Sequence, residues 1–303
     1  MTTETQAAYE HITVSPIAGA LGAEIGNVDL SKPLDDAVIG EIRRAFLDNL
    51  VIFFRDQDIT PEQHKTFARH FGDLHINSFF PTVEGHEDVQ LLIKEPDDTR
   101  PNVGGRWHSD VTYTSKPALG SMLYAKEVPA YGGDTMFANM YLAYETLSDG
   151  MKELLRGLDA FHTAAENFSQ RAAEAELGPV GSKGFVYSAD VEQDAVHPAI
   201  RTHPETGRDA LYINFVFTKY FVGMTREESA PILKFLCDHL SRPEFTCRFK
   251  WEKGSLAFWD NRCAQHFAIN DYLGQRRHMN RVTVQGDAPF LASRKGDAKK
   301  AAA

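Results

Sequence analysis

A histidine and an aspartate stand two residues apart in the segment GRWHSDVTYTS, which runs from Gly105 to Ser115. In an extended chain, residues i and i+2 point to the same face, so the side chains of His108 and Asp110 can reach one ion. Two histidines and one carboxylate leave three positions of a metal ion open, the arrangement of non-haem Fe(II) oxygenases. The motif therefore predicts a metal site that takes a second histidine from elsewhere in the chain.

The best candidate among the 12 histidines is His266, in the segment FWDNRCAQHFAINDY directly after an apolar stretch. Arg277 follows eleven residues later, and Arg281 four residues after that. An arginine on a buried strand beside a metal site destabilises the protein unless an anion pairs with it. Because a guanidinium binds a carboxylate through two parallel hydrogen bonds, these arginines predict a dicarboxylate cosubstrate.

The composition restricts the partners of the protein. Lys and Arg number 32 against 42 Asp and Glu, for a formal charge of −10, and this balance argues against a nucleic-acid partner. The three cysteines form no short pairing motif, which favours a reducing compartment. Neither a secretory signal nor an apolar run of membrane-spanning length is visible, so we expect a cytoplasmic protein without a membrane partner.

The elements that must position these residues are mostly strands. From residue 88 on, apolar or alternating segments between Gly, Pro and Asp turns predict strands at 88–95, 120–128, 134–140, 210–218, 245–252, 255–261 and 281–287. The first ninety residues mix strands at 12–17, 22–30 and 51–56 with helices at 34–50 and 59–72. This pattern predicts a mainly β fold with α: a jelly-roll core, or double-stranded β-helix, with flanking helices.

Two further helices interrupt the strand pattern, at 141–158 and at 225–241 with Thr225 as the N-cap. The segment 163–195 is polar, has little periodicity and is too long for a plain connection, so it is interpreted as a lid insert over a site. No linker divides the chain, and we expect one domain over residues 1–303.

These residues lie in segments that resemble the taurine dioxygenase family of Fe(II)/2-oxoglutarate-dependent dioxygenases, which includes the aryloxyalkanoate dioxygenases. The resemblance covers nearly the whole chain and rests on residues 107–148, 196–218 and 258–290. It implies Fe(II) as cofactor, 2-oxoglutarate and O2 as cosubstrates, and hydroxylation of a C–H bond with release of succinate and CO2. Relatives are often dimers or tetramers, so it also implies a homo-oligomer.

The resemblance assigns a role to each candidate residue. It implies that the iron ligands are His108, Asp110 and His266. Thr135, in GGDT, and Arg277 would hold the distal carboxylate of 2-oxoglutarate, and Arg281 would meet the acidic group of the primary substrate. It places the walls of the substrate pocket at Asn77, Phe80, Val111 and Phe217.

Departures from the taurine pattern bear on the substrate. The taurine enzymes have a polar His and Tyr in the segment that matches LHINSFFP, where this chain has Asn77 and Phe80, and the loop RPNVGGRW differs too. These changes predict a larger or more apolar acid than taurine: an alkyl sulfate, another sulfonate or an aryloxyalkanoate. The alternatives are the same chemistry on a natural product or amino-acid derivative, a zinc hydrolase with the same ligands, and a non-catalytic jelly-roll protein.

Overall fold

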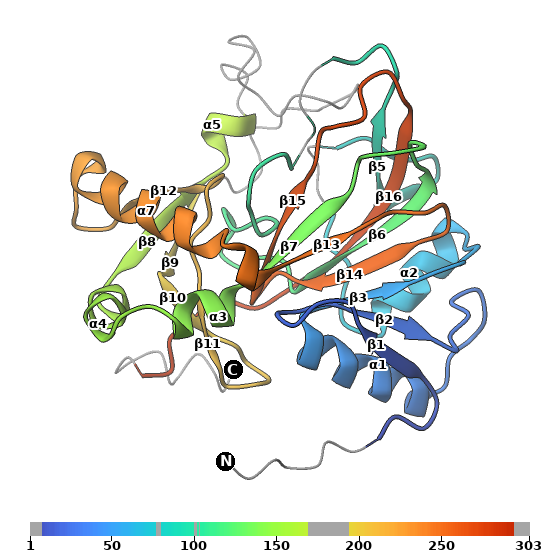
Figure 1. Cartoon of the computed structure of the whole chain (residues 1–303), viewed down its shortest axis with the longest axis horizontal. Coiled ribbons are helices and arrows are strands. Elements are labelled where there is room, and N and C mark those ends of the chain that lie inside the picture. The colour runs from blue at the N-terminus through green and yellow to red at the C-terminus, as the bar shows by residue number, and fades with distance from the viewer. Residues whose placement is uncertain (1–7, 77–79, 100–101, 103, 169–193, 294–303) are drawn as a thin grey trace.

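An eight-stranded sheet is the largest element of the fold (Figure 1). The computed structural model describes residues 8–76, 80–99, 102, 104–168 and 194–293. Only the pair β2–β3 is parallel among the paired strands of this sheet in the described residues. In spatial order, the strands are β1 (Thr13–Pro16), β2 (Ala23–Gly26), β3 (Val51–Phe54), β14 (Leu256–Asp260), β6 (Gly120–Glu127), β16 (Arg277–Val284), β5 (His86–Lys94) and β4 (Thr82–Val83).

A second, three-stranded sheet packs on one face of the large sheet. Its order is β13 (Thr246–Phe249), β7 (Thr135–Asn139) and β15 (Ala264–Ala268). The ring of Phe53 stacks on Phe249 with centroids 3.9 Å apart and meets the edge of Phe137 at 5.6 Å. These contacts join the two sheets into one apolar core. The prediction of a mainly β fold with a two-sheet core is confirmed.

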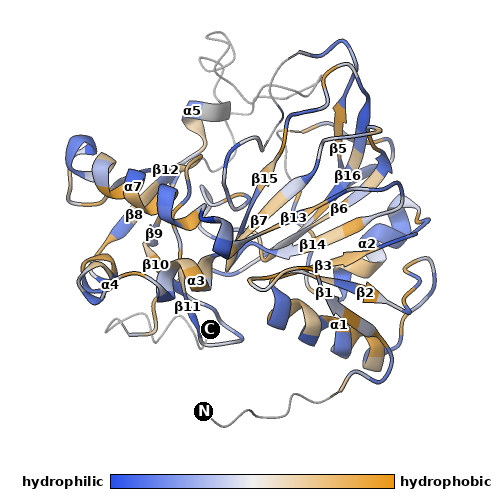
Figure 2. Ribbon diagram, viewed as in Figure 1, coloured by the Kyte–Doolittle hydropathy of each residue, from blue (hydrophilic) through white to orange (hydrophobic). Residues whose placement is uncertain are grey.

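Two helices cover the other face of the large sheet. They are α1 (Asp36–Asn49), capped by Asp35, and α2 (Pro61–Arg69), which begins with a capping box at Thr60. Phe46 of α1 stacks on Phe258 with centroids 4.0 Å apart. Figure 2 shows hydrophobic residues concentrated on β3 and mixed with hydrophilic residues along α1. Both predicted helices are therefore present, and each buries one apolar stripe.

The remaining elements gather beside the small sheet (Figure 1). One three-stranded sheet has the order β12 (Thr218–Phe221), β8 (Asp159–Thr163), β9 (Asp194–Pro198), and a hairpin joins β10 (Ile200–Thr202) to β11 (Asp209–Leu211). The helices are α3 (Met140–Glu145), α4 (Asp149–Arg156), α5 (Ala165–Phe168) and α7 (Arg226–Leu240), followed by the short 3-10 helix η1 (Pro243–Phe245). The predicted helix at 225–241, with Thr225 as its N-cap, is confirmed.

Several predicted elements differ in extent; the strand expected at 281–287, for example, begins earlier, at Arg277, and ends at Val284. The helix expected at 141–158 is two helices, because Thr146 ends α3 and the side chain of Ser148 accepts from Met151 N to begin α4. The strand expected at 210–218 ends at Leu211, because the side-chain oxygen of Asn214 accepts from two backbone N–H groups and folds a turn there.

Two other expectations concern the lid and membrane-spanning segments. The expected lid at 163–195 lies largely outside them, since they include only its two ends. Within the described part of the chain, none of the helices combines the length and the apolar character needed to cross a membrane.

Candidate active site

The two histidines of the predicted metal site pair through their backbones. His108 forms an isolated antiparallel bridge to His266 of β15, with N–H···O distances of 3.1 and 2.8 Å. Asp110 follows, and one of its oxygens, Oδ1, lies 3.7 Å from His108 Nε2 and 3.9 Å from His266 Nε2. All three side chains are buried. The structure thus brings together the three residues that the sequence selected.

The turn after Asp110 has a strained backbone. Val111 has a φ of 58°, in the left-handed region that a β-branched residue rarely adopts. Thr114 closes the turn, donating from its backbone N–H and from its hydroxyl to the carbonyl of Val111. Such strain gathers at functional sites, where the surrounding structure maintains it. Here it turns the chain back directly after the carboxylate.

The protonation states of the cluster suit metal binding. Burial lowers the pKa of both His108 and His266, so both imidazoles are neutral near pH 7. Burial alone would raise the pKa of Asp110, but Arg281 and the two histidines hold it well below its usual range. His108 Nδ1 lies 2.7 Å from the carbonyl of Arg106 and donates to it, which leaves Nε2 as a lone-pair donor. Two neutral imidazoles and one carboxylate within 4.8 Å fit a divalent iron.

Arg277 is the first residue of β16 and is buried, with 8% of its surface exposed. Among the described residues, its Nε and Nη2 atoms have no hydrogen-bond partner, and burial lowers its pKa. Its guanidinium lies 5.7 Å from the ring centre of Trp251, and Trp251 Nε1 donates to Thr135 Oγ1 at 2.9 Å. Because the Thr135 oxygen accepts this bond, its own hydroxyl proton is available to an anion. Thr135 and Arg277 therefore lie on either side of Trp251, each with donors that could bind an anion.

Arg281 lies four residues after Arg277 on β16. Its guanidinium reaches the cluster of His108, Asp110 and His266. Its Nε donates to Gln90 Oε1 at 2.6 Å, and Nη1 lies 3.3 Å from Asp110 Oδ1. The guanidinium also sits 4.9 Å from the ring centre of Phe80. A cation thus lies between the Asp110 carboxylate and the ring of Phe80.

Three of the four residues predicted to form the walls of the substrate pocket share one apolar cluster beside His108. This cluster contains Phe80, Val111, Tyr113, Ala118, Ala164 and Phe217. The ring of Phe217 lies 6.4 Å from that of His108, centre to centre. The fourth predicted residue, Asn77, lies outside the described residues. The cluster supplies an apolar surface next to the Arg281 cation.

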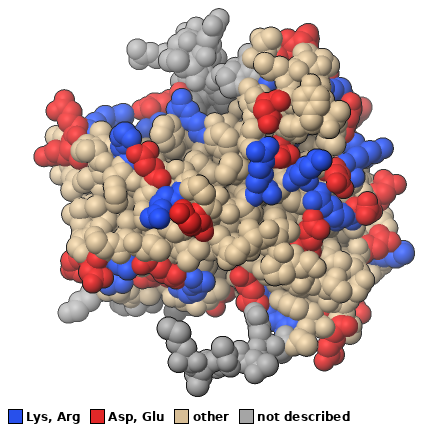
Figure 3. Space-filling view, viewed as in Figure 1, with Lys and Arg blue, Asp and Glu red and all other residues tan. Residues whose placement is uncertain are grey.

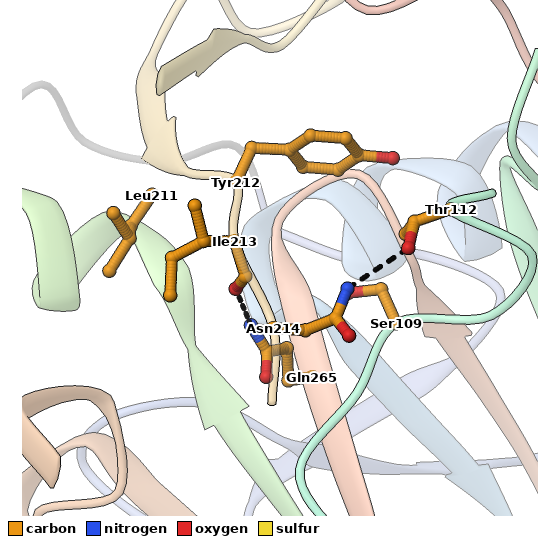
Figure 4. A pocket seen from close by; sticks show the side chains of 7 residues that line it. All are labelled: Ser109, Thr112, Leu211, Tyr212, Ile213, Asn214 and Gln265. Carbon is orange, nitrogen blue, oxygen red and sulfur yellow. Dashed lines mark hydrogen bonds between the residues drawn. The ribbon is translucent and has the colours of Figure 1, made fainter. Parts of the chain in front are cut away.

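A narrow polar pocket lies behind the metal motif, lined by Ser109, Thr112, Leu211, Tyr212, Ile213, Asn214 and Gln265 (Figure 4). Asn214 Nδ2 donates to Thr112 Oγ1 at 3.0 Å, and its Oδ1 accepts from the backbone N–H of Phe217 at 2.8 Å. Asn214 thus links the turn after Asp110 to the loop that presents Phe217. The pocket is small, about 150 Å³, and its lining mixes polar and apolar side chains that contact one another, which suits a structural role rather than a substrate.

Sequence reasoning missed several residues of the site. Ser121 donates to Asp110 Oδ2 at 2.7 Å, Trp251 binds Thr135, and Gln90 binds Arg281. The one local signal was for Gln90, a polar residue in the predicted strand 88–95. Gln90 and Arg281 are also direct partners on the paired strands β5 and β16, whereas Asp110 lies in a turn and Trp251 lies beyond the end of β13, so those two contacts arise only in the tertiary fold.

Comparisons with known proteins agree with this geometry. The alpha-ketoglutarate-dependent sulfate ester dioxygenase of Pseudomonas putida is 34% identical over 279 residues, covering 92% of this chain and 91% of that protein. A crystal structure of a putative alpha-ketoglutarate-dependent taurine dioxygenase from Burkholderia xenovorans superposes with a TM-score of 0.78 at 38% identity, covering 92% of this chain and 94% of that chain. The structure of AAD-2 in complex with Mn(II) and N-oxalylglycine gives a TM-score of 0.74 at 29% identity, covering 92% and 99%.

The fold and these relatives define an Fe(II)- and 2-oxoglutarate-dependent dioxygenase with a jelly-roll core. The chain belongs to the family described as taurine catabolism dioxygenase TauD, TfdA, whose sequence profile matches residues 13–283. The predicted family, fold class, cofactor and cosubstrates are confirmed.

Proposed function

We propose that His108, Asp110 and His266 hold the Fe(II), that Thr135 and Arg277 bind the distal carboxylate of 2-oxoglutarate, and that Arg281 binds the acidic group of the primary substrate. The observation that carries the proposal is the buried cluster of two neutral imidazoles and one ionised carboxylate, with two buried arginines on the neighbouring strand β16. When bound, the metal with 2-oxoglutarate and O2 supplies the oxidation that converts C–H to C–OH, releasing succinate and CO2.

The protein's own residues would bind and orient the cosubstrate and the substrate, and would shield the metal from water. Arg277 and Thr135 offer hydrogen-bond donors on one side of the site, and Arg281 offers a cation on the side of the apolar cluster. Phe80, Val111 and Phe217 would pack against the body of the substrate and keep water from the metal. This division would place the acid of the substrate at Arg281 and its carbon chain beside His108.

The substrate class we propose is a small organic acid with an alkyl or aryl body: a sulfate ester, a sulfonate or an aryloxyalkanoate. Relatives are named for such compounds, including an alkylsulfatase of Acinetobacter baylyi and an (S)-phenoxypropionate dioxygenase of Sphingobium herbicidovorans. Hydroxylation of the carbon next to a sulfate or ether oxygen gives an unstable product that breaks apart. The wall of Phe80 beside Arg281 supports an acid that carries an apolar group.

The partners and the organisation of the protein can be proposed as well. We propose a cytoplasmic homo-oligomer, dimer or tetramer, that acts on small molecules and binds neither nucleic acid nor membranes. The net charge of −10 supports the absence of a nucleic-acid partner, and Figure 3 shows Lys and Arg interspersed with Asp and Glu on the visible face. One core cluster that joins both jelly-roll sheets to α3 and α7 supports a single domain over residues 1–303.

The test is a substrate panel. The protein, loaded with Fe(II) without oxygen, is given 2-oxoglutarate, ascorbate and O2 with sulfonates, alkyl sulfates, aryloxyacetates and aryloxypropionates, and succinate and the oxidised products are measured. Succinate raised by one member with a matching oxidised product supports the proposal. Slow succinate without stimulation by any member contradicts the substrate class, and no succinate from protein shown to hold iron contradicts the assigned site.

A further inference from the structure

The two oxygens of the Asp110 carboxylate have different surroundings. Oδ1 faces the metal cluster, 3.7 Å from His108 Nε2, 3.9 Å from His266 Nε2 and 3.3 Å from Arg281 Nη1. Oδ2 points the other way and accepts a hydrogen bond of 2.7 Å from Ser121 Oγ. At that distance the bond is short and charge-assisted, among the strong side-chain hydrogen bonds of proteins.

The direction of the Ser121 hydroxyl is set by a chain of buried donors. Asn261 Nδ2 donates to Ser121 Oγ at 3.1 Å, so the single hydroxyl proton of Ser121 is left for Asp110 Oδ2. The amide of Asn261 is oriented in turn, because its Oδ1 accepts from Trp259 Nε1 at 3.1 Å and from Asp110 N at 3.0 Å. Each group in the chain can therefore adopt only this one donor and acceptor arrangement.

This series of hydrogen-bonded side chains is also held rigidly in space. Ser121, Trp259 and Asn261 are each at most 1% exposed. Ser121 belongs to β6, in the middle of the large sheet, where it pairs with Trp259 of β14 on one side and with Thr283 of β16 on the other. A hydroxyl in such a position has little freedom to follow a movement of the carboxylate.

We propose that Ser121 is a positioning residue that restricts Asp110 to one coordinating oxygen, Oδ1, and so keeps a coordination position open for the cosubstrates. This role of Ser121 rests on the proposed metal site. A carboxylate can bind a metal ion through one oxygen or through both. With three ligand atoms from the protein, three positions remain, enough for a 2-oxo acid and O2. If Oδ2 also bound, only two would remain.

The test separates metal binding from 2-oxoglutarate binding. The affinity of each protein for Mn(II) is measured by calorimetry without oxygen, followed by the affinity of the Mn(II)-loaded protein for 2-oxoglutarate. In Ser121→Ala we expect Mn(II) to bind as tightly as in the wild type or more tightly, and 2-oxoglutarate to bind about tenfold more weakly. A tenfold loss corresponds to about 1.4 kcal/mol, the size expected for one hydrogen bond to a charged group.

Two variants serve as controls. Ser121→Thr keeps the hydroxyl and should restore the 2-oxoglutarate affinity of the wild type. Ser229→Ala removes another fully buried serine, which lies on α7 and accepts from the backbone N–H of Phe221 on β12, and should change neither affinity. If Ser121→Ala does not fold, Ser121→Cys, whose thiol is a weak donor, receives the same measurements and the same expectation.

Two results would overturn the inference. One is an unchanged 2-oxoglutarate affinity in Ser121→Ala, and the other is a loss of Mn(II) affinity equal to the loss of 2-oxoglutarate affinity. The second would mean that Ser121 merely supports Asp110 as a ligand. Failure of the wild type to bind Mn(II) would instead refute the proposed metal site, so the two failures are distinguishable.

Discussion

Replacing Arg277 with methionine should weaken 2-oxoglutarate binding and, at the same time, stabilise the ligand-free protein. The guanidinium is buried beside Trp251, and among the described residues two of its three nitrogens, Nε and Nη2, have no hydrogen-bond partner. Leaving such donors unpaired in the interior is unfavourable, and burial accordingly lowers the pKa of Arg277. A bound carboxylate would accept hydrogen bonds from both donors. A methionine side chain has no donors, so it would leave none unpaired when the ligand is absent.

The expected magnitudes follow from these contacts. A hydrogen bond to a charged group contributes about 1.5–3 kcal/mol, and about 1.4 kcal/mol is a factor of ten in affinity. The variant Arg277→Met should therefore bind 2-oxoglutarate about 10- to 100-fold more weakly. Replacing a buried charge by an apolar side chain of similar length stabilises proteins by about 1 kcal/mol or more. The free energy of unfolding without metal and cosubstrate should rise by about that amount.

The assay combines calorimetry of 2-oxoglutarate binding to the Mn(II)-loaded protein with urea unfolding of the metal-free protein. Arg276→Met is the matched control, because Arg276 is the neighbouring residue but pairs with Glu95 and Glu127 at the surface. This control should keep the 2-oxoglutarate affinity and lose at most about 1 kcal/mol of stability. An affinity of Arg277→Met within threefold of the wild type would refute the assignment of Arg277.

Three further predictions test other parts of the site and core. Arg281→Gln should raise the KM of the primary substrate far more than that of 2-oxoglutarate, and equal effects would mean that the two arginines have exchanged roles. Gly104→Ala should weaken Mn(II) binding at least tenfold, because a Cβ there would lie 3.1 Å from His108 Cε1 at a φ of 81°. Gly207→Ala, with a φ of 70° and open space, controls for backbone strain and should leave Mn(II) binding unchanged. Burial lowers the pKa of His64 to about 3, below its unfolded value near 6.5, so its contribution to stability is complete above pH 6.5 and falls on acidification. Between pH 7.5 and 5.5 the metal-free wild type should lose about 1.4 kcal/mol more than His64→Leu in urea unfolding, and equal losses would contradict the burial of a neutral imidazole.

Local signals made much of the fold predictable. The helices that begin at Thr60 and Thr225 each have a threonine cap with Gln or Glu three residues later, and both capping boxes are present. The pair His108 and Asp110 was also visible locally, because two residues of spacing places both side chains on one face of an extended chain. These features depend on interactions within a few residues, which a sequence displays directly.

Other elements were not predictable because distant partners create them. The strands β8, β9 and β12 form a sheet of their own, and no prediction anticipated them as strands. The segment after Leu211 reads as a continuous strand, but the side chain of Asn214 accepts from the Phe217 backbone and ends it. A short polar residue can replace the ladder hydrogen bonds of a strand with its own, and the sequence pattern alone does not reveal which it does.

The same distinction applies within the site. Ser121 and Trp251 lie in predicted strand segments, where a serine or a tryptophan has no feature that distinguishes it from core. Trp251 meets Thr135 at a separation of 116 residues, and Asn261 meets Ser121 at 140. Only the pairing of β6 with β14 and of β7 with β13 brings these residues together. The candidate residues for binding the metal and the anion were therefore predictable from the sequence, and the residues that orient them were not.

The register of the large sheet explains which buried cation is left for a ligand. Lys94 of β5 is the direct partner of Arg277 on β16, so two cations lie opposite each other in the interior. Lys94 Nζ donates to Asn270 at 2.6 Å and to Asn102 at 3.2 Å. Arg281 is likewise paired, because it donates to Gln90 and to Asp110.

Arg277 differs from both of these cations. Its Nε and Nη2 lack hydrogen-bond partners among the described residues, and the groups that act on its guanidinium are Trp251, Tyr272 and the Asp134 carboxylate. Burial of unpaired guanidinium donors is unfavourable, so the stability of the core alone does not account for Arg277 at this position. A carboxylate of the cosubstrate beside Arg277 would accept from these donors. Binding of 2-oxoglutarate should therefore stabilise the protein at this position.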